Sequence, residues 1–557
     1  MRSRRLMVSA AAIAAGAGLI PGPAQAAVPA LPAAPAAASA ATPAAGADYT
    51  GTFHSPHERT VRTVLPGGGG QDATGNPDLA ISLMGEITTA RGLSLGINIA
   101  SAEAPLDVTI DWGDGTTGKA SATGAAVLLH NKHTYPRPGE YTVTVTVVDS
   151  VHNVQAVNTM PFATAGSFFV PHAPLRLLDT RSGTGAAKAK VGPYSSVRVK
   201  VAGAGKVPAT VTAVVLNVTV TNTTAGGHVS VYPSGRARPE TSNMNYTAGQ
   251  TVPNMVIVPV GQDGYVELYN GGWNAADLIA DVTGYFDRSA SDGYTALNPV
   301  RFVDTREGNG APRGQVAGQG TIGVQITGRG GVPAGATAVA LNVTVTNPRE
   351  AGHLTVFPSG QAAPTTSNLN FTAGQTVANS VIVPLGPDGK INVRNGAWAG
   401  TDVIVDVVGY YGAGSKAAFT STIRGIPSSP WRLHDSRRAP ANVWPCLAGG
   451  YMRMDLRDWN TNMPIEAHVL NVTVTSTTGA GHLSVAPDPY SMDDYNDGSW
   501  PPMPPRPTSS TLNWTAGKDV PNLVQAKPGP HGVVDFWNQS SREVHYIVDW
   551  FGRYDAY

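Results

Sequence analysis

The hexapeptide L-N-V-T-V-T occurs three times in this 557-residue chain and restricts strongly what the chain can fold into. The copies stand at 216–221, 341–346 and 470–475, each after a D-[TS]-R motif and before a Gly-rich A-G-H or A-G-G-H motif. The step from Asn217 to Asn342 is 125 residues, and the step from His228 to His353 is the same. Solenoid repeats have periods of roughly 20–50 residues, so a period of this length indicates tandem domains.

The residues around each hexapeptide alternate between apolar and polar side chains. In the first copy four apolar side chains fall on one face of a strand, and Asn217, Thr219 and Thr221 fall on the other. This pattern predicts a sheet with one buried face. Further strands are expected at 196–202, 228–232, 255–260, 265–269 and 278–285, separated by Gly-, Pro- and Asn-rich turns. A β-sandwich or jelly roll is the natural unit; a β-trefoil is the alternative, but no threefold pattern runs inside a unit.

A different pattern occupies residues 76–165. The run V-T-I-D-W-G-D-G-T begins at Val108, H-T-Y follows at 133–135, and P-G-E-Y-T-V-T-V-T-V begins at Pro138. These three motifs, in this order, resemble the PKD (polycystic kidney disease) domain. The resemblance implies an immunoglobulin-like sandwich that serves as a spacer or binding module in secreted bacterial proteins. Asp111, Asp114 and His133 are interpreted as turn and strand-end residues rather than as a catalytic or metal site.

The three repeats resemble β-repeats of secreted actinobacterial proteins, and this resemblance implies no particular activity. Before the PKD-like segment, Met1–Ala26 has a basic start, an apolar centre and a small-residue A-Q-A end, as an export signal has. The sequence leaves open whether export would follow the general or the twin-arginine route. The expected organisation is all-β after the leader. It comprises a signal peptide at 1–26, an Ala/Pro-rich disordered tether at 27–75, the PKD-like domain at 76–165, and β-repeats at 168–287, 293–412 and 422–555.

The composition narrows the classes of partner. The chain has 38 basic and 38 acidic residues, so no basic field for nucleic acid is indicated. Charged residues make up 14%, against about 25% in typical soluble proteins. Its one cysteine, Cys446, can form no internal disulfide. No segment after the leader is apolar over the roughly 20 residues that a membrane span needs. A secreted, extracellular protein, free or associated with the cell wall, is expected.

Charged residues recur at matching places in all three repeats. An Asp lies in the apolar closing strand of each copy, where an unpaired carboxylate would cost several kcal/mol. The arginine of D-[TS]-R is predicted to pair with it, so that the first and last strands of each unit are tied together. The predicted structural pairs are Arg181 with Asp281, Arg306 with Asp406, and Arg437 with Asp549. A catalytic role for recurring carboxylates is the less favoured alternative.

Two features suggest surface binding instead. Trp273 and Trp398 occupy matching Gly- and Asn-rich turns, interpreted as hairpin tips, and such rings are plausible stacking platforms for sugars or a partner. The alternative is that each ring folds back over its own hairpin. Repeat three carries an insertion between Pro487 and Pro507 that is absent from the other copies. Its aromatic residues are further candidate ligand-binding positions: Tyr490, Tyr495 and Trp500.

No cofactor is expected, although the acidic residues of the insertion leave calcium open as an alternative to a solvated loop. The Gly-rich motifs of nucleotide-binding folds, the nucleophile elbow and the H-E-x-x-H metal motif are all absent. The sequence therefore favours a non-catalytic binding or adhesion protein that recognises an extracellular polysaccharide or surface protein. A structural scaffold of the cell envelope and an extracellular hydrolase without a recognisable motif remain alternatives. The ligand cannot be named from the sequence.

Overall fold

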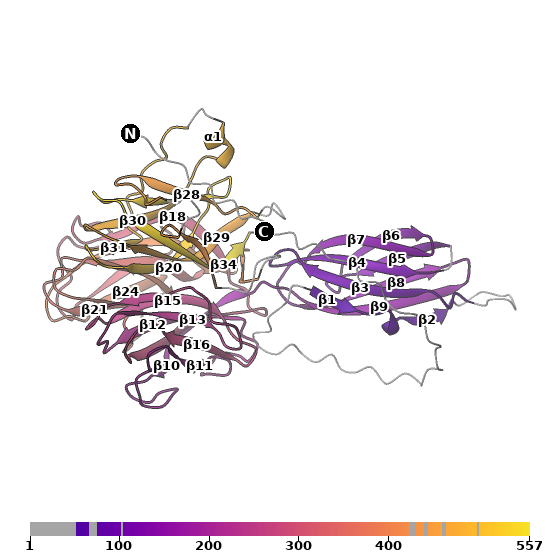
Figure 1. Ribbon diagram of the computed structural model, residues 1–557, viewed down its shortest axis with the longest axis horizontal. Coiled ribbons are helices and arrows are strands. Elements are labelled where there is room, and N and C mark those ends of the chain that lie inside the picture. Colours follow the sequence, from indigo (N-terminus) through magenta and orange to yellow (C-terminus); the bar gives the residue numbers. More distant parts are fainter. Residues whose placement is uncertain are drawn as a thin grey trace.

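A computed structural model describes residues 52–65, 75–101, 104–422, 430–438, 444–458, 464–497 and 501–556. The predicted signal peptide lies outside these residues, as does most of the predicted tether. The described chain is almost entirely β and forms two bodies, a sandwich drawn in indigo and a larger body in which all three repeats gather (Figure 1). Within the described part of the chain no helix is long and apolar enough to cross a membrane.

The amino-terminal body is a sandwich of two antiparallel sheets with short connections. One sheet has the order β1 (Thr52–Ser55), β3 (Ala80–Ile87), β4 (Gly92–Ala100), β7 (Ala126–Thr134). The other has the order β2 (Val61–Val64), β9 (Val154–Ala163), β8 (Glu140–Asp149), β5 (Pro105–Asp111), β6 (Thr117–Thr123), and the 3₁₀ turn η1 (His57–Arg59) links β1 to β2. Between the sheets lies one apolar core that includes Trp112 and Tyr135.

The predicted tether at 27–75 is wrong for residues 52–65, because β1 pairs with β3 and β2 pairs with β9. Phe53 packs on Phe162 at the edge of the core, and polar contacts hold the rest of this segment, which is why its sequence shows no clear period. The side chain of Ser55 donates to Asn158 Oδ1 at 2.7 Å, and Asn158 Nδ2 donates to the carbonyl oxygen of Pro56 at 3.0 Å. Both side chains are buried.

The W-G-D-G turn of the sandwich uses its polar residues locally. Asp111 Oδ1 accepts a hydrogen bond from the Gly113 amide at 2.9 Å. The Asp114 carboxylate contacts His133 Nε2 at 2.7 Å, and the His133 ring stacks on Trp112 with centroids 4.6 Å apart. These contacts fix the turn against the strand that carries His133.

Each repeat is a jelly roll of two four-stranded antiparallel sheets. In chain order, the first, eighth, third and sixth strands form one sheet, and the second, seventh, fourth and fifth form the other. In repeat one the sheets are β10 (Phe168–Asp179), β17 (Asp277–Asp287), β12 (Ala213–Thr221), β15 (Val252–Pro259), and β11 (Ser195–Lys200), β16 (Tyr265–Asn270), β13 (Gly227–Pro233), β14 (Met244–Tyr246). In repeat two they are β18 (Gly293–Asp304), β25 (Asp402–Gly412), β20 (Ala336–Thr346), β23 (Val377–Pro384), and β19 (Thr321–Gln325), β24 (Lys390–Asn395), β21 (Gly352–Pro358), β22 (Leu369–Phe371).

Repeat three follows the same plan with two additions. Its first strand is split into β26 (Ala418–Thr420) and β27 (Trp431–Asp435), which both pair with the last strand. β26 therefore places the start of this repeat before the predicted boundary at residue 422. The sheets are completed by β34 (His545–Asp555), β29 (Ile465–Thr475), β32 (Val520–Ala526), and by β28 (Tyr451–Asp455), β33 (Val533–Asn538), β30 (Gly481–Pro487), β31 (Leu512–Trp514). The insertion contains the short helix α1 (Met492–Asn496).

The three jelly rolls close into a ring about a common axis. Their sixth strands β15, β23 and β32 contact one another. A chemically equivalent hydrogen bond recurs at each interface. Asn217 Nδ2 donates to the Ser367 carbonyl at 2.7 Å, Asn342 Nδ2 to that of Ser510 at 2.5 Å, and Asn471 Nδ2 to that of Ser242 at 2.7 Å. Each repeat thus contacts the next, and the third returns to the first.

The ring changes the interpretation of the L-N-V-T-V-T strand. All nine residues of β12 are buried, and the hexapeptide is fully buried in β20 and β29 as well. The prediction of one buried face is therefore wrong. Valine and leucine side chains fill the jelly-roll core, while the asparagine binds the neighbouring repeat. Both faces of the strand are covered because the repeats pack on one another.

An aromatic cluster fills one end of the ring, with two equivalent residues from each repeat. Its members are Phe169 and Phe286, Tyr294 and Tyr411, and Phe419 and Tyr554. All are buried, and the rings stack in pairs across the repeats. Gln525 donates to the hydroxyls of Tyr411 and Tyr554 at 2.8 and 3.0 Å. The cluster belongs to one apolar core that includes residues of all three repeats.

The sandwich attaches to the ring beside this aromatic end. The Ala90 amide donates to Asp555 Oδ2 at 2.6 Å, and Arg288 Nε donates to the Thr164 carbonyl at 2.9 Å. Ala90, Phe168 and Ala418 form a small buried apolar cluster at the junction. The last strand, β34, therefore ends against the sandwich (Figure 1).

Candidate functional site

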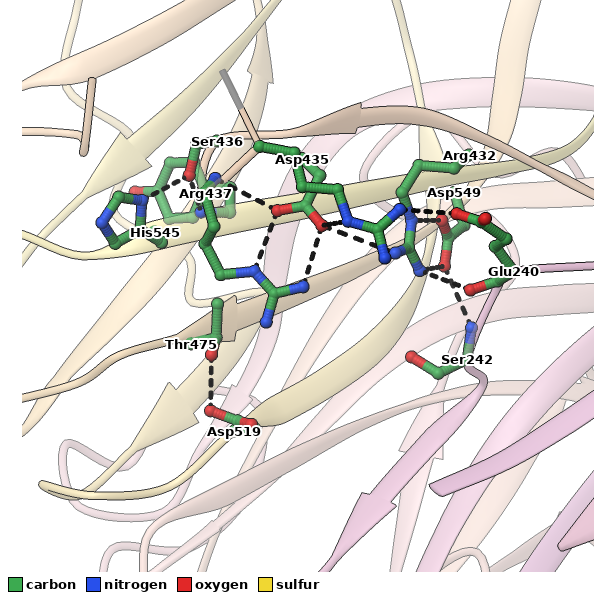
Figure 2. A network of polar contacts seen from close by, with 12 residues as sticks. Glu240, Ser242, Arg432, Asp435, Ser436, Arg437, Thr475, Asp519, His545 and Asp549 are labelled. Atoms are coloured by element: carbon green, nitrogen blue, oxygen red, sulfur yellow. Dashed lines mark hydrogen bonds and ion pairs between the residues drawn. The ribbon is translucent and has the colours of Figure 1, made fainter. Parts of the chain in front are cut away.

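The recurring charges form a four-membered chain in each repeat, shown for repeat three in Figure 2. Arg432 binds Asp549 through two hydrogen bonds, Nε to Oδ1 at 2.7 Å and Nη2 to Oδ2 at 3.3 Å. Its Nη1 also reaches Asp435 at 3.5 Å. Arg437 binds the same Asp435 through Nε at 2.9 Å and Nη2 at 2.8 Å. The order is therefore Arg437, Asp435, Arg432, Asp549.

The first two repeats contain the same chain. Arg176 Nε lies 2.9 Å from Asp281 Oδ1, and Arg301 Nε lies 2.7 Å from Asp406 Oδ1. In each repeat the D-[TS]-R arginine binds the aspartate of its own motif. The corresponding distances are 2.8 Å for Arg181 to Asp179 and 2.6 Å for Arg306 to Asp304.

The predicted pairing of Arg181 with Asp281, Arg306 with Asp406 and Arg437 with Asp549 is therefore wrong. The partner is the arginine five positions earlier, which lies directly opposite the aspartate in the strand register. Arg181 instead follows the end of β10, in the turn after it. The missed signal is the longer motif R-x-x-D-[TS]-R, which is present in all three copies. Strand register decides the partner, and it places the first arginine of this motif opposite the aspartate.

Burial and the neighbouring arginines shift the pKa values of these carboxyl groups in opposite directions. Burial raises the pKa of Asp281, Asp406 and Asp549 in spite of the opposing arginine. In Asp179 and Asp304 the hydrogen bond from the D-[TS]-R arginine outweighs burial and lowers the pKa. In Asp435 burial is the largest single influence and acts to raise the pKa, yet the hydrogen bonds from Arg437 hold the pKa at about 2. Both arginines therefore face ionised or ion-paired carboxylates that belong to the fold.

The charge chain also binds the neighbouring repeat. Arg432 Nη2 donates to the Glu240 carbonyl of repeat one at 2.9 Å, and the Ser242 amide donates to Asp549 Oδ2 at 3.2 Å (Figure 2). In repeat two Arg301 Nη2 donates to the Thr508 carbonyl of repeat three at 3.2 Å. Arg432 and Arg301 thus join the two ends of their own jelly rolls to the adjacent repeat. These contacts assign the recurring charges to assembly of the ring.

The predicted tryptophan turns lie on the outside of the ring. Trp273 and Trp398 are 75% and 84% exposed, so neither ring folds back over its own strand. The turns join β16 to β17 and β24 to β25, which belong to different sheets. The interpretation as hairpin tips is therefore wrong: each turn crosses from one sheet of the jelly roll to the other.

A buried asparagine fixes each tryptophan turn. Asn270 Nδ2 donates to the carbonyl oxygens of Val191, Gly192 and Asn274 at 3.0–3.1 Å, and its Oδ1 accepts from the Gly272 amide at 3.0 Å. Asn395 makes the equivalent contacts in repeat two. There Glu350 Oε1 also accepts from the amides of Trp398 and Ala399. The exposed ring is consequently held on a stiff main chain.

The recurring histidines pack against the same turns. The Gly271 amide donates to the His228 carbonyl at 2.9 Å, and a side chain at Gly271 would collide with the His228 ring. Gly396 and His353 repeat this arrangement. Burial lowers the pKa of both histidines, as it does for His482 in repeat three. These histidines are packing residues of the turn.

The insertion of repeat three is folded rather than open. Tyr495 is buried, and its hydroxyl donates to Asp488 Oδ2 at 2.8 Å. The half-buried Tyr490 packs edge-on against Tyr495, with ring centroids 6.0 Å apart. The Arg453 guanidinium lies over the Tyr495 ring, 3.7 Å from the ring centroid. Tyr495 is thus not available to a ligand, and Trp500 lies outside the described residues.

The acidic residues of the insertion are partly used by its own structure. The Ser491 hydroxyl and the Asp494 carboxylate form a reciprocal capping box at the start of α1. Asp488 is buried beneath the helix and accepts from Tyr490 and Tyr495. In the described part of the chain no group of three or more His, Cys, Asp or Glu side chains is arranged to hold a metal ion.

Comparison with known families bears on the sandwich. Residues 88–162 match the PKD domain family. The predicted resemblance is confirmed, and the matched residues span β4 to β9 of the immunoglobulin-like sandwich. No curated protein matches the chain.

Two solved structures have weak similarity to the chain. One is a carbohydrate-binding module of the β-sandwich superfamily, with 13% identity over 36% of this chain and 92% of the module, at a TM-score of 0.13. The other is a protein of Sulfolobus turreted icosahedral virus, with 12% identity over 66% of this chain and 85% of the viral chain, at a TM-score of 0.14. At these scores neither structure says anything about what this chain binds.

Proposed function

We propose that this protein is a non-catalytic extracellular binding protein whose ring of jelly rolls presents exposed tryptophans to a ligand. The observation that carries the proposal is the pair of equivalent rings, Trp273 and Trp398, on asparagine-fixed turns. Large exposed aromatic side chains are costly to leave in water and are enriched at binding hot spots. Their repetition at matching positions of two repeats argues against chance exposure.

The ring supports binding through two sites at once. Buried contacts hold repeat one against repeat two, so the two turns have a fixed separation and orientation. A ligand with repeated units can then engage both tryptophans, and the second contact forms at a high effective concentration. The PKD domain at the end of the ring supports the extracellular setting, since such domains are common in secreted proteins.

The absence of catalysis belongs to this proposal and rests on how the recurring charges are used. In the described residues each recurring aspartate of the four-membered chains is bound by an arginine of its own repeat. A general acid and a general base would need to face a substrate. We therefore place binding, rather than chemistry, at the tryptophan turns.

Retention of the full chain on cell walls, insoluble polysaccharides and immobilised surface proteins tests the proposal. Trp273→Ala together with Trp398→Ala should abolish retention and leave the melting temperature within a few degrees. Trp444→Ala is the matched control, because Trp444 is also exposed, at 52%, but lies elsewhere in repeat three. Undiminished retention of the double variant would reject the tryptophan turns as the binding surface.

A scaffold function is the second candidate, and one observation favours it. The three repeats bind each other through buried asparagines and apolar side chains, so this β-repeat is suited to self-association. A scaffold would assemble further through contacts between chains. Sedimentation of the purified chain separates the candidates: a concentration-dependent series of oligomers favours a scaffold, and a monomer that is retained by ligand favours binding.

A further inference from the structure

Tyr194 stands beside Trp273 in an unusual backbone conformation. Its φ angle is 53°, in the left-handed region that few residues other than glycine, asparagine and aspartate adopt. Its ring is 52% exposed and meets Trp273 at an interplanar angle of 85°, with the centroids 5.5 Å apart. The two exposed rings therefore form the perpendicular walls of a corner, which we call the aromatic corner.

The other repeats show that the fold does not require a tyrosine at this position. Gln319 in repeat two has φ of 58°, and Gly449 in repeat three has φ of 65°. Gln319 turns back and donates to the carbonyl oxygens of Gly396 and Ala397, so it strengthens its own turn. Tyr194 instead packs its ring against Trp273, at right angles to it. A bulky residue in a strained conformation that glycine adopts freely points to a role beyond folding.

The residues next to the two rings in the chain are small or polar and uncharged. Asn274 follows Trp273 and donates to the Thr224 hydroxyl at 3.1 Å, in an exposed contact. Gly271 and Gly272 precede Trp273, and Ser195 follows Tyr194. The amide of Asn274 and the hydroxyls of Thr224 and Ser195 are neutral hydrogen-bonding groups of the kind that pair with sugar hydroxyls.

We infer that the aromatic corner of Tyr194 and Trp273 is a sugar-binding site that takes one pyranose unit of a neutral polysaccharide. One face of the pyranose ring stacks on Trp273, its edge meets Tyr194, and its hydroxyls bond to Asn274 and Thr224. A docking protein would need a contiguous apolar patch with several buried side chains. Two rings set among Gly, Asn, Ser and Thr fit a sugar, which is amphiphilic, better. The inference rests on the proposed function and names the ligand class of one of its two turns.

Binding of soluble neutral polysaccharides to the full chain tests the inference. Hydroxyethylcellulose, glycol chitin, laminarin and mannan are used as probes in affinity electrophoresis and titration calorimetry. The variants are made in a Trp398→Ala background, which removes the exposed tryptophan ring of repeat two. Trp273→Ala and Tyr194→Gly should each weaken binding of the preferred probe about tenfold or more. Tyr194→Gly restores the residue that repeat three carries, so its fold is not at risk from strain.

A gain of function provides a second arm. Gln319→Tyr should create an aromatic corner beside Trp398 in repeat two and strengthen binding of the same probe to the otherwise unmodified chain. Trp444→Ala should leave all probes unaffected.

Three outcomes would overturn the inference in different ways. If Trp273→Ala abolishes binding and Tyr194→Gly does not change it, the corner is rejected and the tryptophan turns stand. If the chain binds only surface proteins, through the same tryptophans, the sugar assignment fails and the binding function stands. If neither polysaccharides, cell walls nor surface proteins retain the chain, both proposals fail.

Discussion

Asn471 donates its side-chain amide to the carbonyl oxygen of Ser242, 229 residues earlier in the chain, and this hydrogen bond closes the ring of jelly rolls. The same asparagine accepts from Asn254 Nδ2 at 3.0 Å. All three residues lie in buried surroundings at the interface of repeats three and one. Ring closure thus depends on polar groups that have no access to water once the interface has formed.

Asn471→Ala should weaken ring closure. The variant leaves the buried Ser242 carbonyl without this donor, and an unsatisfied buried group costs about 1–3 kcal/mol. Guanidinium unfolding should show a lower midpoint. A separate early transition for repeat three is also expected if closure couples the repeats. An unchanged midpoint would show that the interface is apolar in its energetics.

The two arginines of the charge chain in repeat two should differ sharply in how much stability is lost when each is removed. Arg301→Ala strands Asp406, which is 1% exposed, and breaking such a pair from one side typically costs about 3–5 kcal/mol. Arg306 is the matched control: its side chain is 42% exposed, and its partner Asp304 keeps Arg301. Arg306→Ala should therefore cost clearly less. Chemical denaturation of the two variants measures the difference, and equal losses would contradict the assignment of the partners.

Asp535 should make the chain less stable as the pH rises. It is buried next to the equally buried Asp488, and desolvation, followed by the charge of Asp488, raises its pKa from 3.8 to about 9. The folded state therefore binds a proton that the unfolded state releases above about pH 4. The stabilisation is complete below pH 3.8 and is lost progressively as the pH rises to about 9.

The Asp535→Asn variant checks this prediction, because Asn392 occupies the equivalent position in repeat two. The amide resembles the protonated acid, so the variant should be more stable than the parent at pH 8 and similar to it at pH 4. Denaturation between pH 4 and 9 should show a shallower slope. A variant that is less stable at pH 8 would mean that Asp535 is ionised in the fold.

His468 should act in the opposite direction. It is buried beside Arg553, and desolvation, then the charge of Arg553, lowers its pKa from 6.5 to about 3. The neutral ring stabilises the fold above pH 6.5, and this contribution is lost as the pH falls toward 3. His468→Val introduces the residue found at the equivalent positions, Val214 and Val339. The variant should lose less stability than the parent when the pH is lowered from 7 to 4. An equal loss in the two proteins would count against the prediction.

The sequence predicted the repeats and the strands well because both are local or periodic. The L-N-V-T-V-T strand, the turns of repeat one and the PKD motifs depend on residues close together in the chain. Residues 52–65 were missed because exposed strand edges, held by Asn158, leave no apolar period.

The contacts between repeats could not be predicted from the sequence of a single repeat. The asparagine face of β12 has the pattern of a solvated face and is buried only because another repeat covers it. The partner of Asp281 depends on strand register, which placed Arg176 opposite it. The role of Tyr194 could not be predicted, since a tyrosine in the sequence gives no sign of a left-handed φ angle.

A trimer encoded in one chain is free to be asymmetric. In a homotrimer any new surface feature would appear three times, at the same threefold cost in stability and solubility. Here α1 and its insertion occur on one jelly roll, the turn that carries an exposed tryptophan between the two sheets on two, and the perpendicular pair of Tyr194 and Trp273 on one. Each molecule therefore carries these features in a fixed stoichiometry and order around the axis, so the three faces of the ring can evolve for different neighbours while sharing one core.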